Sequence, residues 1–179
     1  ILKEKLDQTK ASAIITTNND EIVSALKKFN ISNIIVKNPR IAFAEVLDCL
    51  YKTINFKPGI HASAVIDKTA IIGADCHIGP NVYIGENTVI GDNNHILPGS
   101  SILGNVRIGN NNIIHPNCVI YENTTLKNNC VINSNSVIGS EGFGFIPKNG
   151  KWVKMPQKGG VKIMSFVEIG TNCCIDRPA

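Results

Sequence analysis

The sequence predicts a mainly β protein, in which a small α/β domain precedes a parallel β-helix built from hexapeptide repeats. Three observations predict this fold. A branched aliphatic residue returns every six positions from Ile60 to Ile138, Asn and Gly recur at fixed offsets from it, and residues 1–57 alternate strand and helix patterns instead. A period of six fits neither a 3.6-residue helix nor a long strand alternation, so it indicates a repeating fold unit.

The small α/β domain contains two apolar runs, 11–17 and 32–38, that predict short strands, and each is followed by a segment with helical spacing. Asp20 is placed to cap the first helix, because its carboxylate can accept backbone N–H bonds. Asn38 precedes Pro39, the residue type favoured at a helix's first position, and so predicts where the second helix begins. This order of elements predicts a small sheet with helices packed against it.

The second domain is expected over residues 58–179, after a linker at 53–61 that contains Pro58-Gly59. Fourteen consecutive anchor positions, six residues apart, hold Ile or Leu. Small residues usually stand four positions after an anchor, Asn three positions after it, and Gly often directly after it. Each hexapeptide is therefore predicted to form a short strand with inward anchors, plus a corner where Asn and Gly allow the chain to turn. Three hexapeptides, or 18 residues, would close one coil, and coils would stack about 4.8 Å apart.

The repeat is interrupted after Ile138, because the next anchors are Ile163, Ile169 and Ile175, and a step of 25 residues is not a multiple of six. We expect an inserted loop at about 140–160, with a hairpin turn at "PKNGK". The loop contains the only Trp of the chain and a group of lysines: Trp152, Lys148, Lys151, Lys154, Lys158 and Lys162. Two interpretations stay open. The loop is solvated, or it covers a phosphate-bearing ligand or meets an acidic partner.

Composition excludes several classes of protein. Hydrophobic residues make up 43% of the 179 residues, and no apolar run is long enough to span a membrane. The six cysteines form no CxxC pair, and the first ten residues lack the apolar core of a signal peptide, so we expect reduced thiols in a cytoplasm. The net charge of +4 is too small to indicate nucleic acid. Because the chain starts with Ile1 and stops after Ala179, we expect it to be a piece of a longer protein.

The 18-residue coil also predicts which side chains stack. His77 and His95 are one coil apart and lie next to anchors, so we expect an outward column that is solvated or faces another subunit, and no metal site. One inward column contains two amides between two thiols: Cys76, Asn94, Asn112 and Cys130. Stacked Asn amides can hydrogen-bond along the axis, so this column is expected to be structural.

Several motifs together resemble the family of UDP-3-O-acylglucosamine N-acyltransferases. They are "VKNPR" before a helix, the Pro-Gly linker, the hexapeptides, "GSEGFGF" followed by "GKWVKMPQKGGV", and "VEIGTNCCIDR". The resemblance implies a left-handed β-helix and a cytoplasmic enzyme of lipid A biosynthesis that uses no cofactor. Such an enzyme moves a 3-hydroxyacyl chain from acyl carrier protein to the 2-amine of UDP-3-O-acylglucosamine. The resemblance also implies a homotrimer with sites between subunits and a uracil held by the N-terminal domain.

The resemblance leaves the catalytic residue unknown within this chain. A histidine general base is implied beyond Ala179, and no histidine present matches its position: His61, His77, His95 and His115. The 179 residues alone are therefore expected to be inactive. The resemblance implies that five residues are substrate-binding: Gly142, Phe143, Gly144, Asp176 and Arg177. The alternative to a substrate-binding role for Asp176 and Arg177 is a surface ion pair between them. The sequence departs from the family at Pro178, where the family usually has Gly.

Three rival functions share the same repeat. A related O-acyltransferase of the same pathway lacks an N-terminal α/β domain of this kind, so residues 1–57 count against it. A zinc carbonic anhydrase needs three convergent histidines, whereas His77 and His95 give a stack of two. A non-catalytic trimeric solenoid, serving as a scaffold or a surface-binding array, is the third.

Overall fold

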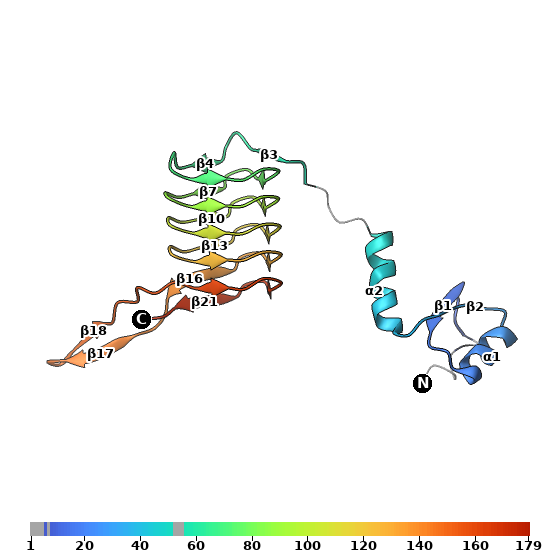
Figure 1. The fold of residues 1–179 in the computed structure, drawn as a ribbon. Helices are drawn as coiled ribbons and strands as arrows, with labels where there is room; N and C mark the ends of the chain where they lie inside the picture. The colour runs from blue at the N-terminus through green and yellow to red at the C-terminus, as the bar shows by residue number, and fades with distance from the viewer. Residues whose placement is uncertain (1–5, 7, 52–55) are drawn as a thin grey trace. The chain divides into compact units, whose positions relative to one another are not determined.

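The computed structural model describes residue 6, residues 8–51 and residues 56–179, and divides the chain into two compact units, Ile1–Asn55 and Phe56–Ala179. Residues 53–55 of the predicted linker lie outside the described residues. The predicted fold class is confirmed: the chain is mainly β, with a left-handed parallel β-helix after a small α/β unit (Figure 1). Neither helix in the described part of the chain has the length and apolar character needed to cross a membrane.

The first unit contains two parallel strands and two helices: β1 (Ala13–Thr16), α1 (Asp20–Lys28), β2 (Ser32–Ile35) and α2 (Pro39–Leu50). Helix α2 begins at Pro39, as predicted, and the side chain of Asn38 caps it by accepting two backbone N–H bonds of the first turn, at 3.1 and 3.3 Å. The α1 cap was predicted wrongly. It is Asn19, which has extended backbone and accepts a bond of 3.2 Å from the Ile22 N–H, while Asp20 is already helical.

The second unit is a prism of three parallel sheets, which the chain visits in turn. The first sheet contains β3 (Gly59–Ile60), β6 (His77–Ile78), β9 (His95–Ile96), β12 (Ile113–Ile114), β15 (Val131–Ile132) and β20 (Glu168–Ile169). The second contains β4 (Val65–Ile66), β7 (Tyr83–Ile84), β10 (Ser101–Ile102), β13 (Val119–Ile120), β16 (Val137–Glu141) and β21 (Cys174–Arg177). The third contains β5 (Ile71–Ile72), β8 (Val89–Ile90), β11 (Arg107–Ile108), β14 (Thr125–Leu126) and β19 (Lys162–Ile163).

The predicted inward anchors form the core of the prism. Paired residues in neighbouring regular coils are 18 apart, as in Ile84 with Ile102, and every anchor from Ile78 to Ile138 is at most 3% exposed. The prediction fails at the first coil, where Ile60 is 56% exposed. The physical reason is that this coil ends the prism, so it packs against a neighbouring coil on one side only (Figure 1).

Polar side chains inside the prism form hydrogen bonds to neighbouring coils along its axis. In the predicted inward column, the amide of Asn112 donates to the Asn94 side-chain oxygen at 2.9 Å, and the Cys130 N–H donates to the Asn112 side-chain oxygen at 2.8 Å. The Cys130 thiol donates to the backbone carbonyl of Met164 at 3.0 Å. These buried groups thus replace their bonds to water, which is the condition for burying them at low cost. The exception inside the described prism is Thr124, whose buried hydroxyl has no hydrogen-bond partner.

The corners explain the repeated Asn. Among the described residues, fourteen non-glycine residues have positive φ; twelve are Asn and one is Asp, as expected for the residue types that best tolerate left-handed backbone. The remaining one is Phe166, with φ 63 and a side chain that is 81% exposed. It stands at the corner between β19 and β20, where the preceding coil has Asn129. Phe166 therefore carries backbone strain that its own packing does not offset.

Replacing Phe166 with Asn is expected to stabilise the β-helix by about 1 kcal/mol, because it relieves a left-handed position of a bulky side chain. The matched control is Asn129→Phe, one coil earlier at the same corner, which should destabilise by a similar amount. Urea unfolding followed by circular dichroism measures both. A Phe166→Asn variant less stable than the parent would show that the aromatic ring packs favourably there.

The predicted insertion leaves the prism after β16 and returns at β19. Its hairpin contains β17 (Phe145–Lys148) and β18 (Lys151–Lys154), which pair antiparallel around Asn149-Gly150, both with positive φ. The chain re-enters in register, because Leu126 pairs with Ile163. A regular step from Ile138 would be six residues and the observed step is 25, so 19 residues are added without disturbing the stacking.

Candidate functional site

The candidate site lies where the insertion leaves the prism. Strands β16 and β21 are longer than the two-residue strands of the regular coils, and they stay paired up to Glu141 and Arg177. Their register shifts at Gly139, which has φ 87. A side chain there would be strained and would meet the Thr124 hydroxyl at 2.8 Å, so the bulge requires glycine. The bulge and the pairing beyond it bring residues 140–142 beside 176–177.

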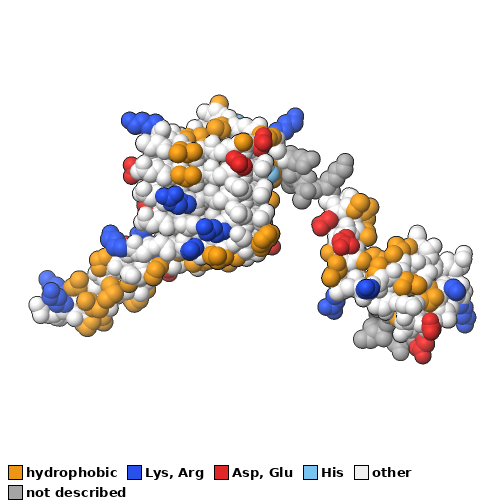
Figure 2. Space-filling view, in the orientation of Figure 1, with side chains coloured by type: hydrophobic (Ala, Val, Ile, Leu, Met, Phe, Trp, Pro, Cys, Tyr) orange, Lys and Arg blue, Asp and Glu red, His pale blue; other side chains and the backbone are white. Residues whose placement is uncertain are grey.

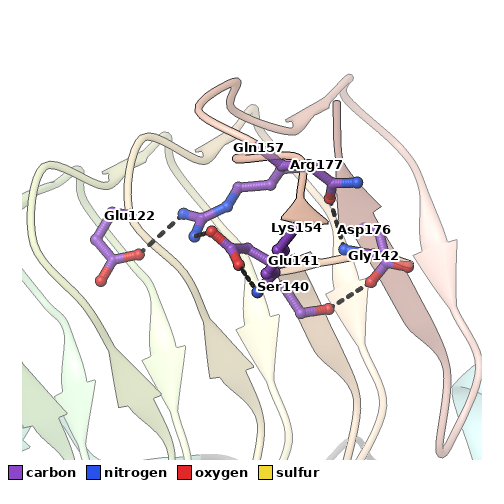
Figure 3. Close-up of polar contacts among 8 residues, drawn as sticks. All are labelled: Glu122, Ser140, Glu141, Gly142, Lys154, Gln157, Asp176 and Arg177. Atoms are coloured by element: carbon purple, nitrogen blue, oxygen red, sulfur yellow. Dashed lines mark hydrogen bonds and ion pairs between the residues drawn. The ribbon is translucent and has the colours of Figure 1, made fainter. Parts of the chain in front are cut away.

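Arg177 is the centre of a charge network (Figure 3). Its guanidinium donates to Glu122 and Glu141, each at 3.3 Å, and it lies 5.9 Å from the ring centre of Tyr121. The Arg177 side chain is only 15% exposed. An arginine this covered needs paired charge, and two carboxylates supply it, so its charge is already committed to the protein.

Glu141 links the prism to the hairpin. Lys154 on β18 pairs with one Glu141 oxygen, while Arg177 bonds to the other (Figure 3). The pKa of Glu141 is lowered from its ordinary value, chiefly by the bond from Lys154. Desolvation opposes this lowering and is the second-largest effect, and the charges of Lys154 and Arg177 then add to the lowering. The ionised carboxylate therefore holds the second hairpin strand against the prism.

Asp176 and Gly142 meet on the other side of the junction. The Ser140 hydroxyl donates to Asp176 at 2.6 Å, and the Gly142 N–H donates to the Gln157 side chain at 2.6 Å. A side chain at Gly142 would lie 2.8 Å from an Asp176 carboxylate oxygen, so any larger residue there would displace the Asp176 side chain. Asp176 is exposed, and none of the ion pairs among the described residues involves it. Its carboxylate is oriented but not neutralised.

An apolar cavity of about 330 Å³ lies beside this junction, lined by Phe143, Phe145 and Trp152. The rings of Phe143 and Phe145 are 5.2 Å apart, and Phe143 is 92% exposed. A backbone hydrogen bond of 2.8 Å, from the Met155 N–H to the Gly144 carbonyl, joins the segment that enters the hairpin to the segment that leaves it. An oriented carboxylate next to exposed aromatic rings can bind a ligand that has both a polar and an apolar part.

The sequence-predicted site residues are thus brought into one region, but in different roles. Gly142 contacts Asp176, and Phe143 lines the cavity. Gly144 accepts the hydrogen bond that joins the two ends of the hairpin. Arg177 pairs with glutamates rather than with Asp176. Sequence reasoning missed the residues that hold the junction together: Tyr121, Glu122, Ser140, Glu141, Lys154 and Gln157. The sequence did contain one sign of this contact region: Glu122 and Ser140 are 18 residues apart, so they occupy the same position in neighbouring coils.

The histidines lie elsewhere on the prism. His77 and His95 stack as predicted, with ring centres 6.4 Å apart, and Phe56 packs against both. His77 Nδ1 is 2.8 Å from the Lys57 carbonyl, and burial, then the charge of His77, lowers the pKa of His95. Within residues 6, 8–51 and 56–179, no group of three or more potential ligands could hold a metal ion.

The α/β unit contains an apolar cavity of its own, about 530 Å³, between its two strands and the start of α2. Ile15, Ile34, Phe43 and Val46 are among its lining residues, and Arg40 is the one cation among the described residues that line it. This composition suits a flat, partly anionic ligand better than an extended apolar chain.

Acidification is expected to release the hairpin from the prism. The pKa of Glu141 is lower in the folded chain, so its contribution is fully present above its ordinary value of 4.5 and is lost as the pH falls through the folded value below that. Amide exchange of Gly142 and Met155, corrected for the intrinsic rate, should therefore accelerate in acid. A Glu141→Gln variant should exchange fast at all pH values, and an unchanged acid transition in that variant would contradict the assignment.

Comparisons with known proteins agree with these observations. A family model described as the GMPPB C-terminal domain matches residues 60–143. A Prochlorococcus marinus protein named UDP-3-O-acylglucosamine N-acyltransferase is 90% identical over 179 residues, which are all of this chain and 52% of that protein. A protein of the same name from Rippkaea orientalis is 56% identical over 174 residues, covering 97% of this chain and 50% of its own length. The chain thus spans about half the length of these relatives.

A solved structure supports the fold alone. The Arabidopsis UDP-N-acetylglucosamine acyltransferase superposes with a TM-score of 0.51 and 22% identity, over 67% of this chain and 49% of that one.

Proposed function

The chain is homologous over its whole length to proteins named UDP-3-O-acylglucosamine N-acyltransferase, and from this premise we propose that it serves the same reaction. A 3-hydroxyacyl chain passes from acyl carrier protein to the 2-amine of UDP-3-O-acylglucosamine. The carbon–nitrogen bond of the amide forms, the carbon–sulfur bond of the thioester breaks, and the amine loses its proton to a general base. The observation that carries the proposal is the 90% identity, which extends through the insertion and the "CIDR" segment.

The candidate site suits this substrate. We assign substrate-binding roles to Gly142, Phe143, Gly144 and Asp176, and a positioning role to Arg177. The exposed Asp176 carboxylate, oriented by Ser140, can accept hydrogen bonds from the sugar amine or a hydroxyl. Phe143 offers apolar surface to an acyl chain. Arg177 contributes by fixing the base of the hairpin, since both of its charge partners are protein carboxylates.

The proposed general base is a histidine outside these residues, so the test needs a longer chain. We would join residues 1–179 to the following segment of the Prochlorococcus marinus relative and supply UDP-3-O-acylglucosamine with acylated carrier protein. Mass spectrometry should find a new amide and the free carrier thiol. An ester formed on UDP-N-acetylglucosamine instead would favour the O-acyltransferase, and no transfer at all would favour the scaffold.

Asp176→Ala in this longer chain is expected to lower kcat/KM by about 10–100-fold, which is the cost of one hydrogen bond to a charged group. The Asp176→Asn variant removes the negative charge but keeps a side-chain oxygen that can accept the hydrogen bond from Ser140, so it shows how much of the loss is due to the charge. The matched control is Asp67→Ala, which removes another aspartate that accepts a hydroxyl bond of 2.6 Å, from Thr69, at a corner of the first coil. Equal losses in Asp67→Ala and Asp176→Ala would refute the substrate-binding role.

A homotrimer is the second part of the proposal. Outward apolar side chains remain exposed on the prism, such as Val65 at 61% and Ile71 at 62%. Such patches favour association, and parallel packing of three prisms would cover them. Light scattering of the longer chain should give three times the monomer mass, and a monomeric mass would contradict the trimer.

A further inference from the structure

The insertion concentrates the positive charge of the chain. The segment 142–162, called here the basic segment, contains five lysines and no Asp or Glu, while the whole chain has a net charge of +4. Without those five charges the rest of the chain would carry 4 − 5 = −1. At the tip of the hairpin, Lys148 is paired directly across from Lys151. Like charges in that position repel each other, which an anionic partner would relieve.

The same segment exposes its apolar side chains. Side chains alternate between the two faces of a ribbon, and residues paired across it share a face. The register therefore puts Phe145, Pro147 and Trp152 on one face together with Lys154, whose charge is paired with Glu141, and Lys148 and Lys151 on the other face together with Ile146 and Val153. Trp152 is 72% exposed, and with Phe143 and Phe145 it forms the aromatic cavity. Figure 2 shows these apolar and basic side chains gathered on the arm that projects from the prism. An exposed apolar patch of this kind marks a surface that interacts with a partner or a membrane.

We propose that the hairpin lays its aromatic face on an anionic lipid bilayer. Trp and Phe favour the boundary between headgroups and acyl chains, and a thin ribbon resting there would hold the lysines of its opposite face at the level of the lipid phosphates. A second copy of this chain fits less well, because its surface outside the basic segment carries almost no net negative charge. A small phosphate ligand would explain the lysines but leave the aromatic rings in water.

The single tryptophan makes the proposal directly measurable. With phosphatidylglycerol vesicles, the 179-residue chain should co-sediment, its Trp152 emission should shift to the blue, and lipids brominated on their acyl chains should quench it. Added salt should weaken the binding, because it screens the lysines. Phosphatidylcholine vesicles should bind much more weakly. None of these readouts needs turnover, so they are independent of the proposed acyl transfer.

Lys148→Gln with Lys151→Gln should weaken the vesicle affinity by roughly 10–30-fold, since each lysine near an anionic surface contributes about one factor of five. Lys27→Gln with Lys28→Gln, two exposed lysines at the end of α1, is the control of equal charge and should bind like the parent. Circular dichroism verifies that both variants fold.

Three results would overturn the proposal. They are the absence of sedimentation with phosphatidylglycerol, sedimentation without a change in Trp152 emission, and a blue shift that grows with protein concentration in the absence of lipid. The last would identify a second copy as the cover.

Discussion

An aspartate in place of Ile102 is expected to unfold the β-helix. Ile102 is fully buried, and its strand β10 pairs with coils on both sides. The substitution removes a large apolar side chain and buries a carboxyl group without a partner, and together these cost roughly 5 kcal/mol or more. A loss of this size equals the whole stability of many small domains. Circular dichroism at neutral pH should show the loss of the sheet signal.

The control for this prediction is the neighbouring residue. Ser101 occupies the same strand but faces outward, so Ser101→Asp should change the free energy of unfolding by less than about 1 kcal/mol. If both variants melted at the same temperature, the assignment of inward and outward faces in β10 would be wrong.

The rate of N-acyl transfer by the 179-residue chain alone is expected to be roughly 10²–10⁴-fold lower than that of the longer chain, which is the effect of losing a general base. This follows from the proposal that the catalytic histidine is none of those present. Both chains would be assayed at equal concentration with UDP-3-O-acylglucosamine and acylated carrier protein. Binding of the nucleotide sugar, measured by calorimetry, separates a chemical defect from a binding defect.

Comparable turnover by the 179 residues would contradict that placement. The base would then be one of His61, His77, His95 and His115. His115 would be replaced first, because it stands at a coil corner, whereas His77 and His95 are packed against Phe56.

The repeat was predictable because each hexapeptide obeys a local rule. An anchor such as Ile90 must face inward, and a corner such as Asn111 must adopt left-handed backbone, whatever the rest of the chain does. The hairpin was predictable for the same reason, since Asn149-Gly150 favours a tight turn. Phe166 breaks the corner rule, so nothing in its residue type reveals its conformation.

The candidate site was only partly predictable, because its contacts are not local. Glu141 and Lys154 meet through the path of the insertion, and a lysine among five in that loop gives no sign of its partner. Similarly, Asp176 and Arg177 were expected either to bind substrate or to pair with each other, and the bulge at Gly139 decides which neighbours they have. Such partners depend on how two segments approach, which the residue order alone does not determine.

The constant coil length has a consequence for how fast the chain folds. Parallel sheets normally fold slowly because their strands are far apart in sequence, but here regular strand pairs join residues 18 apart in a chain of 179, a relative contact order of about 0.10 that is typical of helical bundles. During folding, coils can therefore add to the prism one after another. The exception is the step across the insertion, where Ile138 pairs with Ile175 at a separation of 37. Doubling the closed loop costs about 0.6 kcal/mol more entropy, so we expect the coil after the insertion to be added more slowly than the regular coils.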